Sequence, residues 1–175
     1  MSARVKEYRG TYVSRKDIEE GRVPTFKDKP EAKYAWAAGV AMGRFLAELK
    51  EGRIIGRRCR ACGRVLVPPR MFCEWCFRPT DEWVYVRDTG TVLTYSISYL
   101  GPAAERLKEP IIIAVIELDG ASPGIGILHK LGEVKPEAVH VGMRVKAVWK
   151  PPEEREGAIT DILYFKPLEG EGGGE

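Results

Sequence analysis

The chain has 175 residues, of which 44% are hydrophobic and 30% charged, a composition typical of a globular protein with one ordinary domain or two small ones. Its 28 lysines and arginines and 25 acidic residues leave a formal net charge of +3, which argues against a nucleic-acid or membrane binder driven by overall charge. The longest apolar run, residues 111–116, is too short to span a bilayer, and the charged start does not resemble a secretion signal. We therefore expect a protein of the reducing cytoplasm without a membrane partner.

Residues 1–30 are polar and carry Pro24 and Pro30. Ser14 could cap a short helical turn around residues 17–20. We expect this segment to be an extended or disordered arm. The sequence leaves open whether the arm stays disordered or wraps around a partner.

Residues 31–52 are predicted to form an amphipathic helix, with Gly52 at its C-terminal cap. Apolar residues recur there at three- and four-residue steps: Tyr34, Ala38, Ala41, Phe45 and Leu49. A second face carries the small residues Ala35, Gly39 and Gly43, which would let another backbone approach closely. That backbone could belong to this chain or to another subunit, and both alternatives stay open.

Residues 53–83 contain all four cysteines of the chain, in two Cys-x-x-Cys pairs: Cys59, Cys62, Cys73 and Cys76. Each pair can direct two thiolates at one metal ion, and four soft thiolates suit tetrahedral zinc. The pattern therefore predicts a rubredoxin-like zinc ribbon. Because four protein ligands would close the coordination shell, the expected role of the metal is structural and not catalytic.

Two other interpretations of the four cysteines exist. Disulfides are disfavoured, because the chain shows no secretion signal and has no cysteine outside the two pairs. Iron is harder to exclude, since a tetrahedral four-thiolate site admits either metal.

The ribbon segment is locally rich in arginine, with no acidic residue between positions 53 and 70: Arg53, Arg57, Arg58, Arg60, Arg64 and Arg70. Some of these cations could balance the net negative charge of a four-thiolate zinc centre. Guanidinium groups also match phosphate oxygens in pairs. We expect at least part of the cluster to face a phosphate-bearing ligand or an acidic partner.

Residues 84–168 read as five β segments separated by turn signals: 91–99, 110–118, 124–131, 145–149 and 157–165. Segments of these lengths predict a small five-stranded barrel of the OB type, with a β-sandwich as the alternative. The fold class is thus mainly β with an N-terminal helix. Residues 169–175 contain only Gly and Glu and are expected to be disordered.

Residues 31–168 resemble a known family in the order of their elements. Short motifs follow the predicted helix in this order: Glu51-Gly52-Arg53 before the first cysteine pair, Pro68-Pro69-Arg70 before the second, Gly90-Thr91-Val92 at the start of the barrel, and Phe165-x-Pro167 at its end. Together they resemble the zinc-ribbon plus OB-fold family formerly catalogued as a domain of unknown function and described as acyl-CoA-associated.

The resemblance implies a scaffold role beside thiolase-like enzymes. Members bridge acetoacetyl-CoA thiolase and hydroxymethylglutaryl-CoA synthase in archaea, and others accompany thiolase-like aldolases in bacteria. It also implies binding of the CoA part of an acyl-CoA. Arg64 and Arg70, on the loop between the cysteine pairs, are our candidates for contacts with the CoA phosphates.

The chain offers few candidates for catalysis of its own. If every cysteine binds metal, no thiol nucleophile remains, and neither His129 nor His140 lies in a recognisable catalytic motif. A non-catalytic accessory subunit is therefore expected. The alternative is a nucleic-acid-binding module, in which Tyr95, Tyr99, Trp149 and Tyr164 would stack on bases; the barrel segment is not basic enough to favour it.

Overall fold

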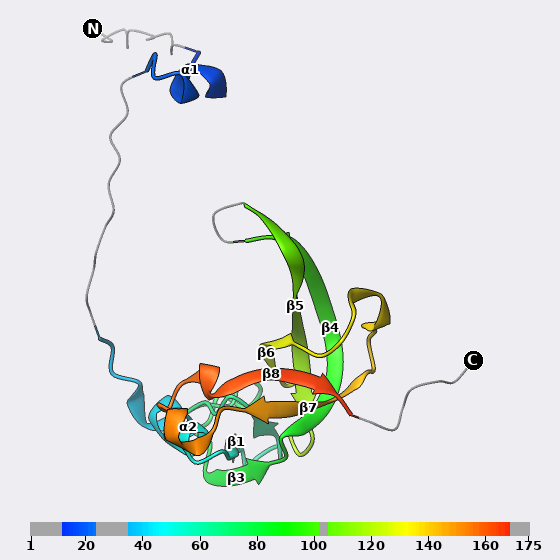
Figure 1. Cartoon of the computed structure of the whole chain (residues 1–175). Coiled ribbons are helices and arrows are strands. Elements are labelled where there is room, and N and C mark those ends of the chain that lie inside the picture. The colour runs from blue at the N-terminus through cyan, green and yellow to red at the C-terminus, as the bar shows by residue number, and fades with distance from the viewer. Residues whose placement is uncertain (1–11, 24–34, 102–104, 169–175) are drawn as a thin grey trace, which may run out of the picture. The chain divides into compact units, whose positions relative to one another are not determined.

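The computed structural model describes residues 12–23, 35–101 and 105–168. The chain divides into two compact units, residues 1–36 and 37–175 (Figure 1). Much of the predicted N-terminal arm and all of residues 169–175 lie outside the described residues. Among the helices that are described, none is long and apolar enough to cross a membrane.

The first unit contains one short helix, α1 (Arg15–Glu19), where the sequence predicted a helical turn. Ser14 caps it: its hydroxyl accepts a hydrogen bond from the Asp17 amide at 3.2 Å, and the Asp17 carboxylate accepts one from the Ser14 amide at 2.9 Å. This reciprocal capping box satisfies amide groups that a helix N-terminus leaves unpaired.

The second unit begins with helix α2 (Gly39–Lys50), which is shorter than the predicted 31–52. Residues 35–38 are not helical, and Gly39 has a φ of 68°, a left-handed conformation that breaks the helical path before it. Ala41, Phe45 and Leu49 are buried as predicted, whereas Ala38 is exposed and Tyr34 lies outside the described residues.

The small-residue face of α2 has no close neighbour in the described part of the chain. A Cβ atom placed on Gly39 would meet no heavy atom within 4 Å, and one on Gly43 would meet only the Cβ of Ala38, at 3.9 Å. The described ribbon therefore does not fill this face.

The ribbon contains a three-stranded antiparallel sheet in the order β2-β1-β3: β1 (Ile54–Arg58), β2 (Val65–Leu66) and β3 (Glu82–Val86). Gly56 on β1 allows β2 to approach closely, because a Cβ atom there would lie 2.7 Å from the carbonyl oxygen of Leu66. No larger residue fits that contact without moving backbone.

Five strands form a closed barrel in the order β4-β5-β6-β8-β7, which confirms the predicted OB-type fold over the sandwich alternative. They are β4 (Thr89–Leu100), β5 (Arg106–Leu118), β6 (Gly126–Leu131), β7 (Arg144–Trp149) and β8 (Ile162–Pro167). The long β4–β5 hairpin extends away from the barrel body (Figure 1). A single residue pair, Leu131 with Phe165, closes the ring between β6 and β8.

The last strand begins at Ile162, although the sequence predicted a strand over 157–165. Residues 159–161 instead form a short 3₁₀ turn that ends in Asp161, a fully buried side chain. Its carboxylate accepts hydrogen bonds from the amides of Glu156, Gly157 and Ala158 at 3.0, 2.7 and 3.0 Å. This local network competes with strand formation, as short acidic side chains commonly do.

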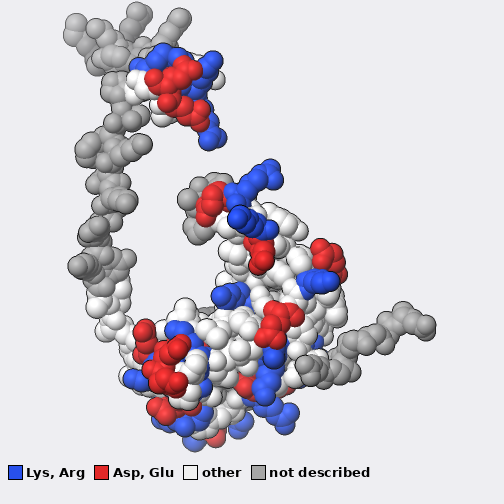
Figure 2. Space-filling view, viewed as in Figure 1, with Lys and Arg blue, Asp and Glu red and all other residues white. Residues whose placement is uncertain are grey.

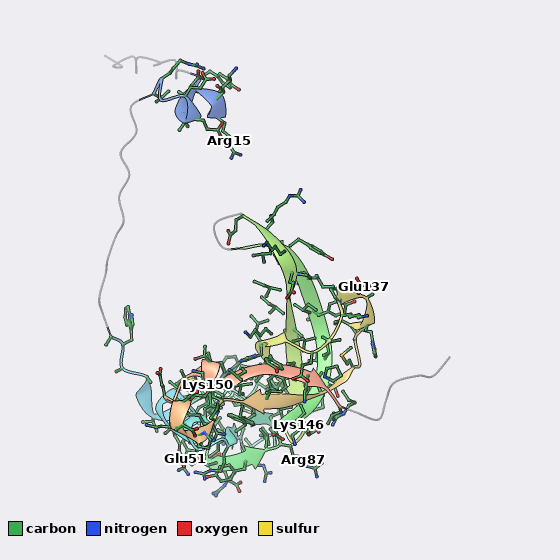
Figure 3. The ribbon with its side chains drawn as sticks, in the orientation of Figure 1. Arg15, Glu51, Arg87, Glu137, Lys146 and Lys150 are labelled. Carbon is green, nitrogen blue, oxygen red and sulfur yellow. The ribbon has the colours of Figure 1, made fainter. Side chains whose placement is uncertain are left out.

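Helix, ribbon and barrel share one continuous hydrophobic core. Phe45 and Leu49 from α2 and Leu66 from the ribbon belong to the same cluster as Val92 and Phe165 from the barrel, all with at most 1% exposure. The shape of the ribbon is thus coupled to the packing of the barrel. Figure 3 shows the side chains of these elements, with Arg87 between β3 and β4 at the edge of this body.

Candidate metal centre and the arginine surface around it

The four cysteines lie on two knuckles of matching backbone geometry. In the first, the amide of Cys59 donates to the carbonyl of Arg64, and the amide of Gly63 donates to the carbonyl of Cys59. In the second, the amide of Cys73 donates to the carbonyl of Arg78, and the amide of Phe77 donates to the carbonyl of Cys73. The fifth residue of each knuckle has a positive φ, 76° at Gly63 and 50° at Phe77.

The knuckles bring all four sulfur atoms within 4.8 Å of one another, and all four are free thiols. The Sγ atoms of Cys62 and Cys73 lie 3.6 Å apart, close to the edge of about 3.8 Å expected for a tetrahedron with zinc–sulfur bonds of about 2.3 Å. Cys59 and Cys73 are buried, while Cys62 is exposed. These residues fit a four-thiolate zinc ion with no position left for water or substrate.

Hydrogen bonds within the cluster shift the pKa values of two of these thiols. The backbone amide of Cys76 is the main cause that lowers the pKa of Cys73 to about 7, and the neighbouring Cys62 thiol is the main cause that raises the pKa of Cys76 to about 12. A bound divalent cation would stabilise all four as thiolates.

Four of the six ribbon arginines form ion pairs with carboxylates that lie outside the arginine-rich stretch. The pairs are Arg53 with Glu48 at 2.7 Å, Arg58 with Glu82 at 3.7 Å, Arg64 with Glu74, and Arg70 with Glu74 at 3.6 Å. The local positive charge predicted from the sequence is therefore largely neutralised by folding. A fifth arginine, Arg57, is buried and donates to the hydroxyl of Thr80 at 2.7 Å beneath the ring of Trp83.

The two arginines predicted to contact CoA differ in their surroundings. The side chain of Arg64 is only 11% exposed; it pairs with Glu74, and its guanidinium lies 3.9 Å from the centre of the Trp75 ring. The Arg70 side chain is 55% exposed. Arg64 thus supports the second knuckle, and Arg70 alone of this pair presents a largely exposed guanidinium.

The sequence reasoning named Arg60 in the arginine-rich stretch but missed Arg78, which the fold brings to the same hollow. Arg60 and Arg78 line one hollow of about 450 Å³ with Ala61, Pro79 and Asp81. Both arginines are exposed, and within the described residues neither side chain forms an ion pair. Arg78 stands after the second cysteine pair, in the place that Arg64 has after the first, and this matching position was the available signal.

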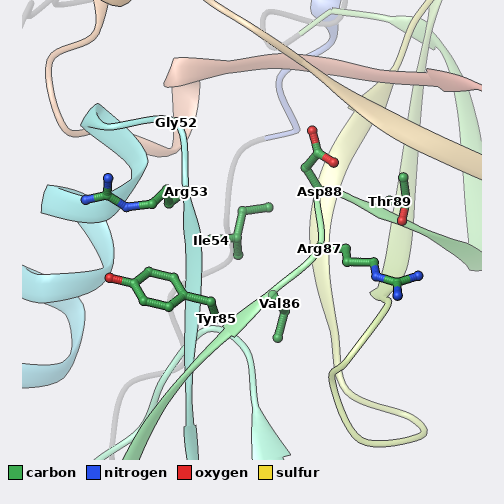
Figure 4. A pocket seen from close by; sticks show the side chains of 8 residues that line it. All are labelled: Gly52, Arg53, Ile54, Tyr85, Val86, Arg87, Asp88 and Thr89. Carbon is green, nitrogen blue, oxygen red and sulfur yellow. The ribbon is translucent and has the colours of Figure 1, made fainter.

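A second hollow lies where the ribbon meets the barrel. It measures about 340 Å³ and is shown in Figure 4, with Arg53 and Tyr85 on one side, Arg87 and Thr89 on the other, and Ile54 between them. It continues past Arg87 into an open groove of about 850 Å³ that reaches Arg144. Most of its charge is neutralised, since Arg53 pairs with Glu48 and Arg144 forms two hydrogen bonds with Asp119, at 2.8 and 2.5 Å.

The Arg144 pair also changes the acidity of Asp119. Its hydrogen bonds are the main cause that lowers the pKa of Asp119 to about 2, so the carboxylate stays charged under all ordinary conditions. This pair links β7 to the end of β5 and holds the groove wall in place.

Neither histidine is arranged as a catalytic base. His129 places its Nε2 atom 3.3 Å from the carbonyl oxygen of Ile159 and its ring edge-on to Phe165, at 5.6 Å between centroids. The His140 ring places its Nδ1 atom 3.1 Å from the nearby carbonyl oxygen of Ala138. A catalytic imidazole is usually oriented by a carboxylate or a similar group, and here both rings face backbone carbonyls.

The second knuckle also exposes four large apolar side chains within seven residues: Met71 at 40%, Phe72 at 62%, Trp75 at 70% and Phe77 at 87%. Phe77 occupies the left-handed conformation for which the first knuckle uses Gly63. That conformation costs a residue with a Cβ atom roughly 1–2 kcal/mol. Sequence reasoning noted the cysteines of this knuckle and passed over its aromatic residues.

Comparisons with known proteins agree with this architecture. Residues 46–82 match the rubredoxin-like zinc ribbon domain of ChsH2, and residues 83–150 match the C-terminal OB-fold domain of ChsH2. A DUF35 domain-containing scaffold protein of Methanocaldococcus jannaschii is 38% identical over 119 residues, which cover 66% of this chain and 82% of that protein.

Two solved structures share the fold. A DUF35-family protein of unknown function from Sulfolobus solfataricus is 35% identical, with a TM-score of 0.52 over 63% of this chain and 78% of that one. The Ltp2–ChsH2(DUF35) aldolase is 25% identical, with a TM-score of 0.52 over 71% of this chain and 91% of that one. The ribbon of two cysteine knuckles followed by a five-stranded OB barrel thus places this chain in the DUF35 family.

Proposed function

We propose that the chain is a non-catalytic scaffold subunit that binds the CoA part of an acyl-CoA and docks on a thiolase-like enzyme. Relatives named as scaffold proteins and a neighbouring structure of an aldolase that contains a ChsH2 DUF35 part support an accessory role. An acetoacetyl-CoA thiolase, with hydroxymethylglutaryl-CoA synthase as a second enzyme, is the partner type proposed. The four free thiols favour a reducing compartment such as the cytoplasm.

The observation that carries the CoA proposal is the hollow between Arg60 and Arg78. CoA carries a pyrophosphate and a ribose phosphate, and guanidinium groups bind such oxygens two at a time. Arg60 lies in the first knuckle and Arg78 just after the second. The four-cysteine cluster and the buried Arg57–Thr80 contact hold these two segments in place. Arg70, whose carbonyl accepts a hydrogen bond from the Thr80 hydroxyl at 2.5 Å, has an exposed guanidinium outside this hollow, whereas Arg64 serves the ribbon itself.

Titration calorimetry with free CoA tests this proposal. In the double variant Arg60→Ala/Arg78→Ala, CoA should bind at least about tenfold more weakly, because each lost charge-assisted hydrogen bond is worth about 1.5–3 kcal/mol. Neither arginine contributes an ion pair to the described fold, so the thermal stability of the variant should be unchanged.

Arg87→Ala is the matched control, since Arg87 is also exposed but lines the groove between ribbon and barrel. Equal CoA affinity in the double variant and the unmodified chain would show that CoA does not bind between Arg60 and Arg78. A loss of affinity in Arg87→Ala alone would place the phosphates in the junction groove instead.

Nucleic-acid binding is a second candidate, because Tyr95 and Tyr99 on β4 are 37% and 56% exposed. The other two aromatic residues considered are engaged within the chain: Trp149 donates to Asp88 at 3.4 Å, and Tyr164 donates to Glu133 at 2.6 Å. Acidic and basic side chains are interspersed over the face seen in Figure 2, so no basic track follows the barrel there. Binding to single-stranded oligonucleotides that weakens steeply with salt would support this candidate.

A further inference from the structure

The exposed apolar side chains Met71, Phe72, Trp75 and Phe77 form what we call the knuckle patch. Folding alone does not explain them. Gly63 gives the first knuckle the same backbone turn with no side chain, whereas the second knuckle places a phenylalanine there, in a left-handed conformation and with 87% of its surface exposed. A residue kept in an unfavourable conformation while it packs against little of its own chain points to a role outside the fold.

The knuckle patch is also held in a fixed shape. The Trp75 ring is covered on one face by the guanidinium of Arg64, which is held in turn by Glu74. The backbone on both sides of Trp75 is fixed by the hydrogen bonds of the knuckle and by the bridge between Phe72 and Pro79. A large aromatic side chain that is rigid before binding loses little conformational entropy when a partner covers it.

The charges around the patch indicate what covers it. Arg70 is exposed beside it and lies outside the hollow that Arg60 and Arg78 share, and the nearby carboxylate of Glu74 is already paired with two arginines. A second copy of the chain fits poorly, because a two-fold contact through this patch would bring arginine against arginine. A protein surface with an apolar pocket and a rim of carboxylates fits both the aromatic residues and the cations.

We propose that the knuckle patch is the surface through which this chain docks on its partner enzyme, with Trp75 and Phe77 entering an apolar pocket whose rim is acidic. This inference rests on the proposed scaffold function and adds its docking surface. The metal centre then acts on assembly indirectly, because it fixes the knuckle that presents these side chains.

The test measures the affinity of the purified full chain for the thiolase-like enzyme encoded in the same genome. Phe77→Gly should weaken binding at least about 30-fold, the loss typical of an interface hot spot, and Trp75→Ala should do the same. Phe77→Gly places in the second knuckle the residue that already serves the first, so metal content and thermal stability should not fall. Leu128→Ala is the matched control: Leu128 is 67% exposed on the barrel strand β6 and should leave affinity unchanged.

The outcomes separate this inference from the function on which it rests. If the unmodified chain does not bind the enzyme, the proposed function fails. If it binds and both knuckle variants bind equally well, only the docking surface is refuted. Two results would assign the patch to another occupant and overturn the proposal: binding to vesicles of anionic lipid that Phe77→Gly abolishes, or self-association in sedimentation that the same variant abolishes.

Discussion

Replacing Cys73 with serine should release the metal and unfold the ribbon, the largest effect expected of any single substitution in the chain. Structural zinc contributes about 10–16 kcal/mol to the folding of zinc-finger peptides, and Cys73 is a fully buried member of the four-thiol cluster. Because Val65, Leu66 and Val67 of the ribbon belong to the same core as the barrel, the melting temperature of the whole second unit should fall as well.

Elemental analysis and thermal circular dichroism check this expectation. The unmodified chain should contain one metal ion, and elemental analysis also decides between zinc and iron. Removing the ion with a chelator should reproduce the defect, and adding zinc back to the chelated protein should reverse it. A Cys73→Ser protein that keeps one ion per chain and an unchanged melting temperature would show that these four thiols do not form the site.

Asp161→Ala should cost about 3–5 kcal/mol of unfolding free energy, the second largest effect that we expect. Its carboxylate is fully buried and accepts three backbone hydrogen bonds, so its removal leaves three amides without their acceptor. Burial raises the pKa of Asp161, but the amides of Glu156, Ala158 and Gly157 together hold it below its usual value. The charged carboxylate therefore stabilises the fold fully when the pH is above the usual pKa of an aspartate. This stabilisation is lost as the pH falls through the lowered pKa of Asp161.

Urea unfolding at neutral pH measures this cost. Glu154→Ala is the control, since Glu154 is an exposed acidic residue of the preceding 3₁₀ turn and should change stability by less than about 0.5 kcal/mol. A cost below about 1 kcal/mol for Asp161→Ala would mean that the turn before β8 does not depend on this carboxylate.

The parts of the fold that the sequence predicts are those with short-range signals. Two Cys-x-x-Cys pairs are a local pattern, and the knuckles that they form depend on bonds between residues four or five apart. Apolar segments bounded by turn residues located the barrel strands for the same reason. The predicted start of the last strand was wrong. The apolar residue Ile159 suggested a strand, but the carboxylate of Asp161 accepts hydrogen bonds from nearby backbone amides and residues 159–161 form a turn.

The charge of the ribbon surface could not be predicted in this way. The arginines of residues 53–70 stand together in the sequence, and the carboxylates that neutralise them, Glu48, Glu74 and Glu82, lie just outside that stretch. Only folding pairs Glu74 with Arg64 and Glu82 with Arg58. Arg78 lies outside the arginine-rich stretch and faces the same hollow as Arg60. Ion pairing of this kind depends on distances in space, so counting charges along the chain overestimates the free positive surface.

The scaffold role proposed for this chain requires that it bind a thiolase-like enzyme, and the mass of the resulting complex tests that role most directly. The chain and the enzyme encoded in the same genome would be co-expressed and analysed by size-exclusion chromatography with light scattering, at micromolar concentration and with CoA present. We expect a single species whose mass is the sum of both proteins in a fixed ratio. Two separate species, each with the mass it has alone, would contradict the scaffold role.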